Sequence, residues 1–298
     1  LILVPIMAWM AVNNQLPAGQ DWHAVIAPEQ FDVLREASFI GIVSLLAWGL
    51  GYFGQPHILV RFMAATSAKA IPKARRIGMS WMILCLAGAV AVGFIGIPYF
   101  AANPGHAAAV TANHETVFME LSRQLFNPWL AGLLLAAILA AVMSTLSCQL
   151  LVCSSALTED LYRTFLRRNA GQKELVWVGR AMVMLVSVIA VAIASDPTSK
   201  VLGMVSYAWA GFGAAFGPVI LLSLFWPRMT RNGALAGIVV GAITVLVWKQ
   251  GGWLGLYEIV PGFILATLSV LVFSLMGSQP SSAMLTRFKS VDAELSQR

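Results

Sequence analysis

Polar side chains crowd into residues 140–155, in the middle of a long apolar run. The polar residues of this stretch are Ser144, Thr145, Ser147, Gln149, Ser154 and Ser155. A membrane-buried segment normally excludes such groups, because an unpaired buried polar group is costly. One helical face, with the spacing i, i+3, i+4 and i+7, carries Ala141, Ser144, Thr145 and Cys148. The chemistry open to this face is close helix contact or the binding of a small hard cation by hydroxyl oxygens.

The residues of this face leave both interpretations open. Membrane helices often use Ser, Thr and Ala where they pack against one another. A cation site would need more oxygens than two hydroxyls supply, and the backbone carbonyls of an unwound neighbouring helix are the natural source. The cation hypothesis therefore gains weight if another span of the chain is broken.

Residues 47–57 have the composition of a broken helix. The residues that disfavour a continuous helix are Gly49, Gly51, Gly54 and Pro56. Broken helices at membrane depth are tolerated where they are buried in protein or line a cavity, and in transporters they mark the substrate site. Trp48 and Tyr52, at i and i+4, would flank this break. An aromatic belt at the membrane interface is the alternative interpretation of the same pair.

A third stretch, residues 206–218, is rich in glycine and aromatic residues. Gly213 and Gly217 form a small-xxx-small pair, which predicts close packing against another helix. Tyr207 and Trp209 could reach a cavity, but the sequence does not require it.

The composition is that of a polytopic membrane protein. The mean hydropathy is +0.79 and 11% of the residues are charged, against about a quarter in ordinary globular chains. We expect an all-α helix bundle with eight spans, the first one truncated: 1–12, 37–54, 79–101, 127–157, 175–194, 201–226, 233–248 and 259–276. Leu1 lies in an apolar run with no charged leader before it, so we expect a fragment of a longer chain.

The basic residues lie mostly on one side of the expected membrane. With eight spans, 15 of the 19 Lys and Arg residues fall on one side. By the positive-inside rule this side is cytoplasmic, and the C-terminus lies there too. The net charge of +6 therefore reflects topology, and nucleic-acid binding is not expected.

Motifs for catalysis or for metal centres are not found. The histidines lie in expected loops or at span ends without ligand spacing, and they are His23, His57, His106 and His114. The cysteines, expected to be small buried hydrophobes, are Cys85, Cys148 and Cys153. No glycine-rich phosphate loop appears. We therefore expect no enzyme, no catalytic residues and no ATP-driven pump in this sequence.

The sequence resembles the sodium:solute symporter family, and most closely the members that carry proline. The stretches that carry the resemblance are Trp48-Gly-Leu-Gly-Tyr-Phe-Gly-Gln-Pro56, Ala140-Ala-Val-Met-Ser-Thr-Leu-Ser-Cys148 and Ser206-Tyr-Ala-Trp-Ala-Gly-Phe-Gly-Ala-Ala-Phe-Gly-Pro218. A further signature runs through Ser223, Leu224, Arg228, Gly233, Ala234, Gly237 and Gly241. The resemblance covers essentially all 298 residues.

The resemblance implies a fold of two five-helix repeats of inverted topology. On this mapping residues 1–298 are a single, incomplete transmembrane transporter domain, 35–226 are the second inverted repeat, and 227–298 are accessory helices and a cytoplasmic tail. It places sodium coordination on the carbonyl of Ala141 and the hydroxyls of Ser144 and Thr145, facing the first helix of the first repeat, which lies outside this sequence. Substrate contacts fall on Trp48 and Tyr52, with Pro56 shaping the break.

The implied function is sodium-coupled secondary active transport of L-proline by alternating access, in a bacterial inner membrane. Sodium is the coupling ion and no other cofactor is expected. The partners are L-proline, the sodium ion and membrane lipid, with no nucleic acid. The alternatives are another small solute on the same fold, a symporter-like sensor domain, which would need a long cytoplasmic extension, and a channel.

Overall fold

The computed structural model describes residues 1–15, 38–196 and 200–296, and every regular element within those ranges is helical. The fold is therefore all-α, as the composition predicted. The loop expected at 13–36 and the turn expected at 195–200 lie largely or partly outside the described residues. The chain forms two compact units, one of residues 1–36 and 65–149 and one of residues 37–64 and 150–298.

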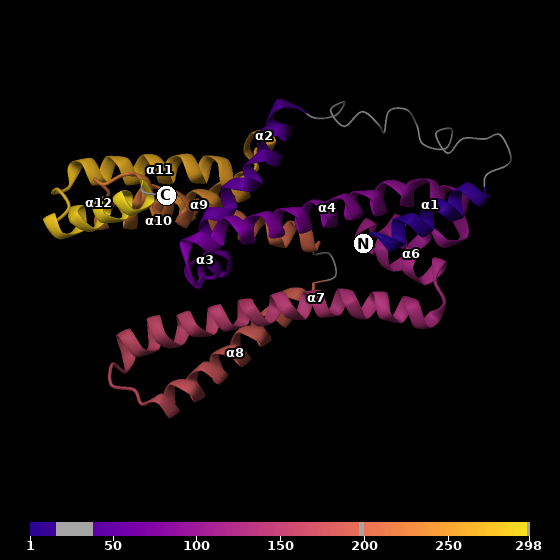
Figure 1. Ribbon diagram of the computed structural model, residues 1–298, viewed down its shortest axis with the longest axis horizontal. Helices are drawn as coiled ribbons and strands as arrows, with labels where there is room; N and C mark the ends of the chain where they lie inside the picture. The colour runs from indigo at the N-terminus through magenta and orange to yellow at the C-terminus, as the bar shows by residue number, and fades with distance from the viewer. Residues whose placement is uncertain (16–37, 197–199, 297–298) are drawn as a thin grey trace. The chain divides into compact units, whose positions relative to one another are not determined.

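Figure 1 carries the labels of most of the α-helices, and η marks 3-10 helices and one π-helix. The elements of the first unit are α1 (Leu3–Gln15), η4 (Ala68–Ala70), α4 (Ile71–Ala102), η5 (Pro104–His106), α5 (Ala108–Ala112), η6 (His114–Thr116), α6 (Val117–Leu125) and most of α7 (Pro128–Ser155). Those of the second unit are α2 (Phe39–Ala47), η3 (Trp48–Gly54), α3 (Pro56–Met63), the π-helix η7 (Ala156–Leu166), α8 (Gln172–Ala194), α9 (Val201–Phe225), α10 (Arg231–Gly251), η8 (Trp253–Gly255), α11 (Ile259–Met276) and α12 (Ser282–Ser296).

Helices long and apolar enough to cross a membrane occupy the expected positions. Among the described residues there are six: Ala68–Ala102, Pro128–Leu166, Gln172–Ala194, Val201–Phe225, Arg231–Gly251 and Ile259–Met276. The pair Phe39–Gly54 and Pro56–Met63, bent by 52°, adds a broken span, and Leu3–Asn14 is a shorter apolar helix. These segments coincide with the eight expected spans, the short first one included.

Three segments expected as loops or tail are helical instead. The fourth span does not end at Leu157 but continues as η7 to Leu166. The loop expected at 55–78 contains α3 and the first turns of α4, and the tail expected at 277–298 contains α12. These expectations were wrong because a helix need not end where its apolar stretch ends. In η7, for example, Arg163 reaches Glu159 at 2.9 Å, so the charged turn supports the helix.

The core of the first unit is formed by α1 against α4 and α6. Val4, Ala8 and Val12 recur every four residues on one face of α1 and are fully or almost fully buried. They share a cluster with Val92 of α4 and Leu121 of α6.

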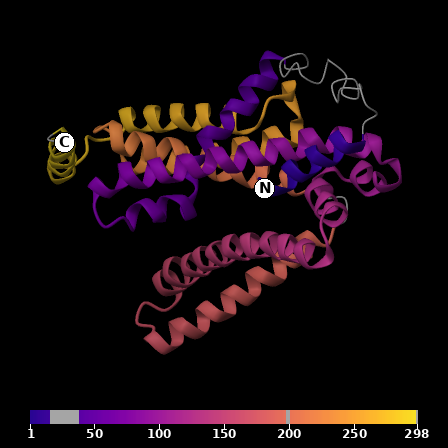
Figure 2. The same cartoon turned by 45° about the vertical axis from the view of Figure 1, so that its right-hand side comes forward.

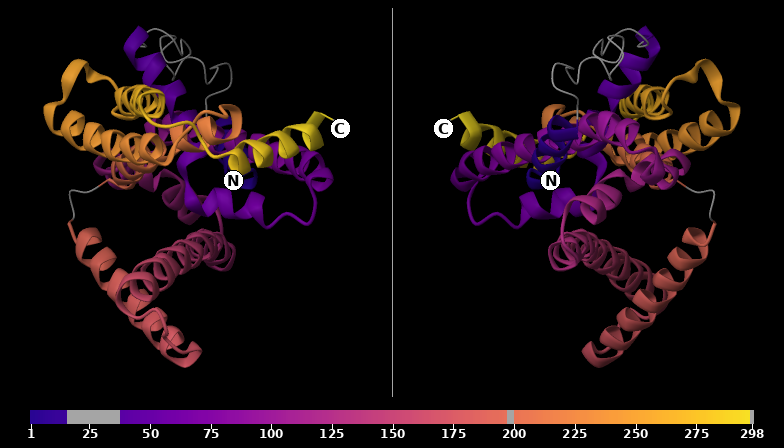
Figure 3. Two further views of the ribbon diagram at one scale, coloured as in Figure 1. Left: turned by 90° about the vertical axis from the view of Figure 1, so that its left-hand side faces the viewer. Right: turned by 90° about the vertical axis from the view of Figure 1, so that its right-hand side faces the viewer.

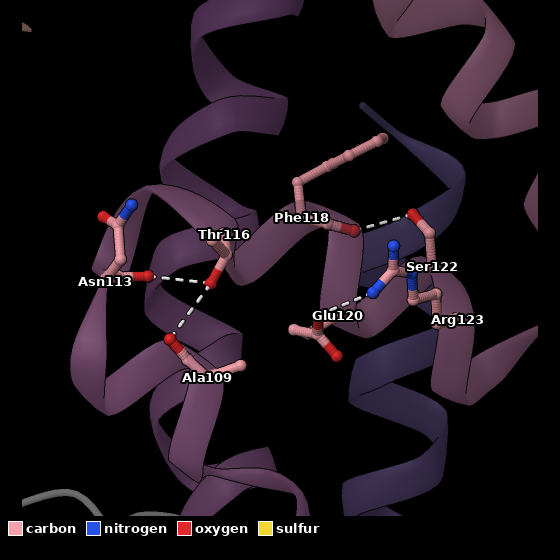
Figure 4. Close-up of polar contacts among 7 residues, drawn as sticks. All are labelled: Ala109, Asn113, Thr116, Phe118, Glu120, Ser122 and Arg123. Carbon is pink, nitrogen blue, oxygen red and sulfur yellow. Dashed lines mark hydrogen bonds and ion pairs between the residues drawn. The ribbon is translucent and has the colours of Figure 1, made fainter. Parts of the chain in front are cut away.

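The segment between α4 and α7 is held by local hydrogen bonds, shown in Figure 4. The Thr116 hydroxyl donates to the carbonyl of Asn113 at 2.7 Å and lies 3.4 Å from that of Ala109. The Ser122 hydroxyl donates to the Phe118 carbonyl at 2.7 Å. Much of this segment, which lies between the third and fourth expected spans, is therefore helical.

The core of the second unit is a group of α9, α10 and α11, which run side by side in Figures 1 and 2. Their close approach depends on glycines. A Cβ atom on Gly241 of α10 would lie 2.5 Å from the Ala214 carbonyl oxygen, and one on Gly262 of α11 would lie 2.7 Å from the Ala214 Cβ. Small side chains at these crossings bring three backbones together around one buried alanine.

The remaining part of the second unit is the pair η7 and α8, in which α8 runs back along the helix before it (Figure 2). The Ser154 hydroxyl donates to the Gly179 carbonyl at 2.8 Å. The Tyr162 hydroxyl donates to the Glu174 carboxylate at 2.7 Å, and Arg167 lies 3.5 Å from the same oxygen.

Candidate functional site

The broken helix predicted at residues 47–57 is present. The α-helical geometry of α2 ends at Ala47, the chain continues as the 3-10 helix η3, and Gln55 has extended dihedral angles of φ −83° and ψ 114°. A new helix, α3, begins at Pro56, whose missing N–H is not needed in the first turn. The change of helix type and the extended residue produce the 52° bend. Pro56 therefore lies at the break that it was expected to shape.

Trp209 of α9 contacts both ends of η3. Its indole N–H donates to the backbone carbonyl of Trp48 at 2.9 Å, and its own carbonyl accepts a hydrogen bond from the Gln55 side-chain amide at 3.2 Å. Gln55 is 4% exposed, so its amide would lose free energy if it were left unpaired. These two bonds connect Trp48, the first residue of η3, and Gln55, the residue that follows the last one of η3, to Trp209 of α9.

The close approach of η3 and α9 requires glycine on both sides. A Cβ on Gly51 would overlap the Trp209 indole, and a Cβ on Gly54 would overlap the Phe212 carbonyl. On α9, a Cβ on Gly213 would lie 2.7 Å from the Gly51 Cα. The prediction that Gly213 serves close packing is confirmed, with the broken helix as its partner.

The two aromatic residues predicted to flank the break meet on Trp209. The Trp48 and Trp209 rings are stacked with centroids 5.3 Å apart, and Tyr52 meets Trp209 edge-on at 4.8 Å. Trp48 also lies parallel to Tyr257, at 6.3 Å between centroids. Tyr52 keeps 47% of its surface exposed. Trp48, Tyr52, Trp209 and Tyr257 thus form one aromatic cluster, in which Tyr52 is exposed and the other three residues are partly buried.

Tyr257 joins the turn between α10 and α11 to this cluster. Its backbone N–H donates to the Ser44 hydroxyl of α2 at 3.1 Å, and its phenol donates to the Ser206 carbonyl of α9 at 2.7 Å. Burial, and to a smaller extent the charge of Glu258, raises the pKa of Tyr257 above its ordinary value, so the phenol stays protonated and remains a donor.

A charged pair lies next to Tyr257. The Glu258 side chain is 8% exposed, and one of its carboxylate oxygens lies 3.4 Å from the Lys249 ammonium without a hydrogen bond. The same ammonium lies 5.9 Å from the centroid of the Tyr207 ring. Tyr207 therefore lies beside this charged pair.

The sequence indicated part of this cluster and missed the rest. The Gly-rich break predicted the location of Trp48 and Tyr52, but Trp209 was only a residue that could reach a cavity. The buried amide of Gln55, between a glycine and a proline, was a usable signal that a partner must satisfy it. No local pattern marked Tyr257, because its role depends on chain segments more than 50 residues away.

The predicted sodium ligands lie on α7, in the part of that helix that belongs to the first unit. Ala141, Ser144 and Thr145 are all exposed and share one helical face. The Thr145 hydroxyl donates to the Ala141 carbonyl at 3.3 Å, so two of the three proposed ligand oxygens are already close together. Inside α7 this carbonyl also accepts a backbone N–H from the next helical turn, so both of its lone pairs are engaged until the Thr145 hydroxyl turns away.

The donor set of this face suits a hard monovalent cation better than a transition metal. It consists of neutral hydroxyl and carbonyl oxygens, which hard cations prefer. Within the described ranges, no group of three or more His, Cys, Asp or Glu side chains is placed to hold a metal ion. The face supplies only part of a coordination shell. The aromatic cluster belongs to the second unit.

Comparison with known proteins identifies the family. The model of the sodium:solute symporter family matches residues 3–241. The chain is 67% identical over 295 residues to the sodium/proline symporter of Escherichia coli K12, covering 98% of this chain and 58% of that protein. It is 51% identical over 300 residues to the sodium/proline symporter of Haemophilus influenzae, covering 98% and 60%. It is 50% identical over 299 residues to the high-affinity proline transporter PutP of Bacillus subtilis, covering 100% and 62%.

The chain thus spans about three fifths of the length of these curated relatives. The family match extends from α1 into α10 and includes both the broken helix and α7. Six spanning helices and one broken span make the chain part of a multi-pass membrane protein. The chain belongs to the sodium:solute symporter family.

Proposed function

We propose that the full-length protein imports L-proline by sodium-coupled secondary active transport with alternating access. The observation that carries the proposal is the broken helix at η3, which contains Trp48 and Tyr52 and is tied to α9 at both ends. Relatives that are 50–67% identical are named as sodium/proline symporters or as a proline transporter. The activity is transport driven by a gradient and is not an enzymatic reaction.

The proposed substrate contacts follow from the chemistry of proline. The molecule is a zwitterion with an apolar ring. The exposed Tyr52 side chain, which shares one aromatic cluster with Trp48, suits the apolar ring. Backbone groups released where α2 gives way to η3 and where Gln55 is extended suit the charged ends. Pro56 keeps the break in place by starting a new helix.

The proposed sodium site uses the Ala141 carbonyl and the hydroxyls of Ser144 and Thr145. The missing oxygens are expected from the first helix of the first repeat, outside this chain. Sodium would then bridge the two repeats and favour the state that binds proline, and this coupling must be reciprocal. Each charge that crosses adds about 2.3 kcal/mol per 100 mV of membrane potential.

The remaining assignments follow the same proposal. Residues 35–226 form the second inverted repeat, and 227–298 form accessory helices and a tail. The excess of Lys and Arg on one set of loops supports a cytoplasmic C-terminus in a bacterial inner membrane.

The sodium site is tested in the full-length protein by replacing Ser144→Ala and Thr145→Ala together. Removing two ligand hydroxyls should raise the sodium concentration for half-maximal proline uptake at least about tenfold, which corresponds to about 1.4 kcal/mol. The control is Ser147→Ala, because that hydroxyl donates to the Met143 carbonyl at 2.8 Å and lies off the predicted face. Sodium activation that is the same in the double variant and in the control would rule the site out.

The identity of the solute is tested separately, by competition. Labelled proline uptake is measured against a panel of unlabelled amino acids, sugars and carboxylates. Proline itself should compete best. A solute that competes more strongly would move the assignment to another substrate on the same fold. Uptake that does not saturate would favour a channel, and binding without uptake would favour a sensor.

A further inference from the structure

A cavity of about 460 Å³ lies between the α9–α10 turn and α12, within the second unit. Its wall includes the guanidinium-bearing residues Arg231 and Arg287, and its apolar lining includes Leu224, Trp226, Met284 and Phe288. The cavity lies just beyond the end of α9 at Phe225, at the start of α10. It is separate from the aromatic cluster and from the α7 face.

Arg231 and Arg287 bring two positive charges to this cavity. Within the described part of the chain, neither guanidinium has a carboxylate partner. Arg228, on the same turn, differs because it donates to the Leu275 carbonyl at 3.4 Å. Two positive charges at one cavity repel each other and favour the binding of an anion there. Guanidinium groups bind phosphate oxygens with paired, charge-assisted hydrogen bonds.

The apolar side of the cavity belongs to an amphipathic helix. Met284, Phe288 and Val291 follow the spacing i, i+4 and i+7 on α12, and Met284 remains 63% exposed. Figure 3 shows α12 turning away from the line of α11. An exposed apolar face beside basic residues is the pattern of a helix that lies in the membrane interface. Trp226 is also typical of that depth.

The two arginines and the apolar face of α12 together fit one ligand that contains both a phosphate group and apolar chains. We propose that the cavity binds an anionic phospholipid, with Arg231 and Arg287 on the phosphodiester and the acyl chains against Leu224, Met284 and Phe288. A free phosphate would satisfy the arginines but would leave the apolar face of α12 in water. A neutral zwitterionic lipid would bring its own positive charge to two arginines. The site is independent of the transport assignment.

The test uses native mass spectrometry of the purified full-length protein, after delipidation in detergent. Phosphatidylglycerol is added back, and phosphatidylcholine is added in a parallel series. The double variant Arg231→Gln/Arg287→Gln should retain phosphatidylglycerol at least about tenfold more weakly than the parent protein, with little change for phosphatidylcholine. The matched control, Arg75→Gln/Arg76→Gln, removes the same charge from two exposed residues at the start of α4 and should retain phosphatidylglycerol normally.

Two further arms define the occupant. Phe288→Ser should also weaken phosphatidylglycerol retention, because it removes apolar lining while keeping both charges. Glycerol phosphate, which has no acyl chains, should not displace the lipid. The proposal is overturned if both double variants lose the lipid equally, if phosphatidylcholine is lost to the same extent, or if glycerol phosphate displaces it. Unchanged circular dichroism of the variants excludes loss of fold as the cause.

Discussion

Trp209 is the residue on which the candidate substrate site depends most. It stacks on Trp48, meets Tyr52 edge-on, and makes hydrogen bonds to both ends of η3. Its ring also occupies the space that a side chain at residue 51 would need. Trp209, on α9, therefore positions Trp48 and Tyr52, the two residues proposed to contact proline.

We expect Trp209→Phe to weaken proline binding without abolishing transport. Phenylalanine keeps an aromatic ring but cannot donate to the Trp48 carbonyl. The loss of one neutral hydrogen bond, worth about 1 kcal/mol, should raise the KM for proline about fivefold. The measurement is the initial rate of proline uptake at saturating sodium by the full-length protein.

A matched control is Trp177→Phe on α8, where the tryptophan is 69% exposed and outside the cluster. Its KM should stay at the parental value. An unchanged KM in Trp209→Phe, at normal protein abundance, would show that the indole bond does not position the site.

At the scale of elements, the broken helix is stable because α9 supplies hydrogen bonds and packing contacts that η3 does not make within itself. A 3-10 segment has poorer hydrogen-bond geometry than an α-helix, and Pro56 cannot donate. The packing of Gly51 and Gly54 against α9, and the two bonds of Trp209, compensate for these losses. The break is thus a joint property of η3 and α9.

Two glycines of η3 provide a sharp comparison for this packing. Gly51→Ala should destabilise the protein, because the new Cβ would overlap the Trp209 indole. Overpacking of this kind costs about 1–3 kcal/mol. In Gly49→Ala, by contrast, the described residues leave open space around the new methyl group. The unfolding midpoint of the full-length protein in detergent should fall clearly in the first variant and little in the second. Equal midpoints would contradict the packing of η3 on α9.

At the scale of the whole molecule, the basic residues follow the order of the spans along the chain. They gather at the start of α4, around η7, in the α9–α10 turn and on α12, whereas the segment between α4 and α7 contains a single Arg. In the proposed orientation, which follows the positive-inside rule, the first group lies in the cytoplasm. The cavity between the α9–α10 turn and α12 would then face the cytoplasmic leaflet, which carries anionic lipid.

This orientation predicts the labelling of introduced cysteines in intact cells. Ala112→Cys and Ser278→Cys both change exposed residues, one before α7 and one after α11. A membrane-impermeant maleimide should label the first directly and the second only after permeabilisation. The unsubstituted protein is the control for the three natural cysteines. The reverse pattern would invert the topology.

Local properties of the chain allowed much of this to be predicted from the sequence. The length of the apolar runs predicted the membrane spans, and the glycines before Pro56 predicted the break in the helix. The helical spacing predicted that Ser144 and Thr145 share one face. Each depends on residues close together in the chain, so no knowledge of partners is needed. The sequence did not predict the helical end at Leu166 or the helix α12, because both segments are rich in charged residues, which are typical of loops. In η7 the pair of Glu159 and Arg163 supports the helix instead.

Tertiary structure alone decided which residues meet at the break. Trp209 lies 161 residues from Trp48, and Tyr257 lies 213 residues from Ser44. Contacts across such distances depend on how α9 and the α10–α11 turn pack, and that packing is set by glycines whose partners cannot be identified from their own neighbours in the sequence. The sequence by itself therefore determined where the helix breaks and which residues share one face of α7. Only the packed second unit determined what holds the break in place.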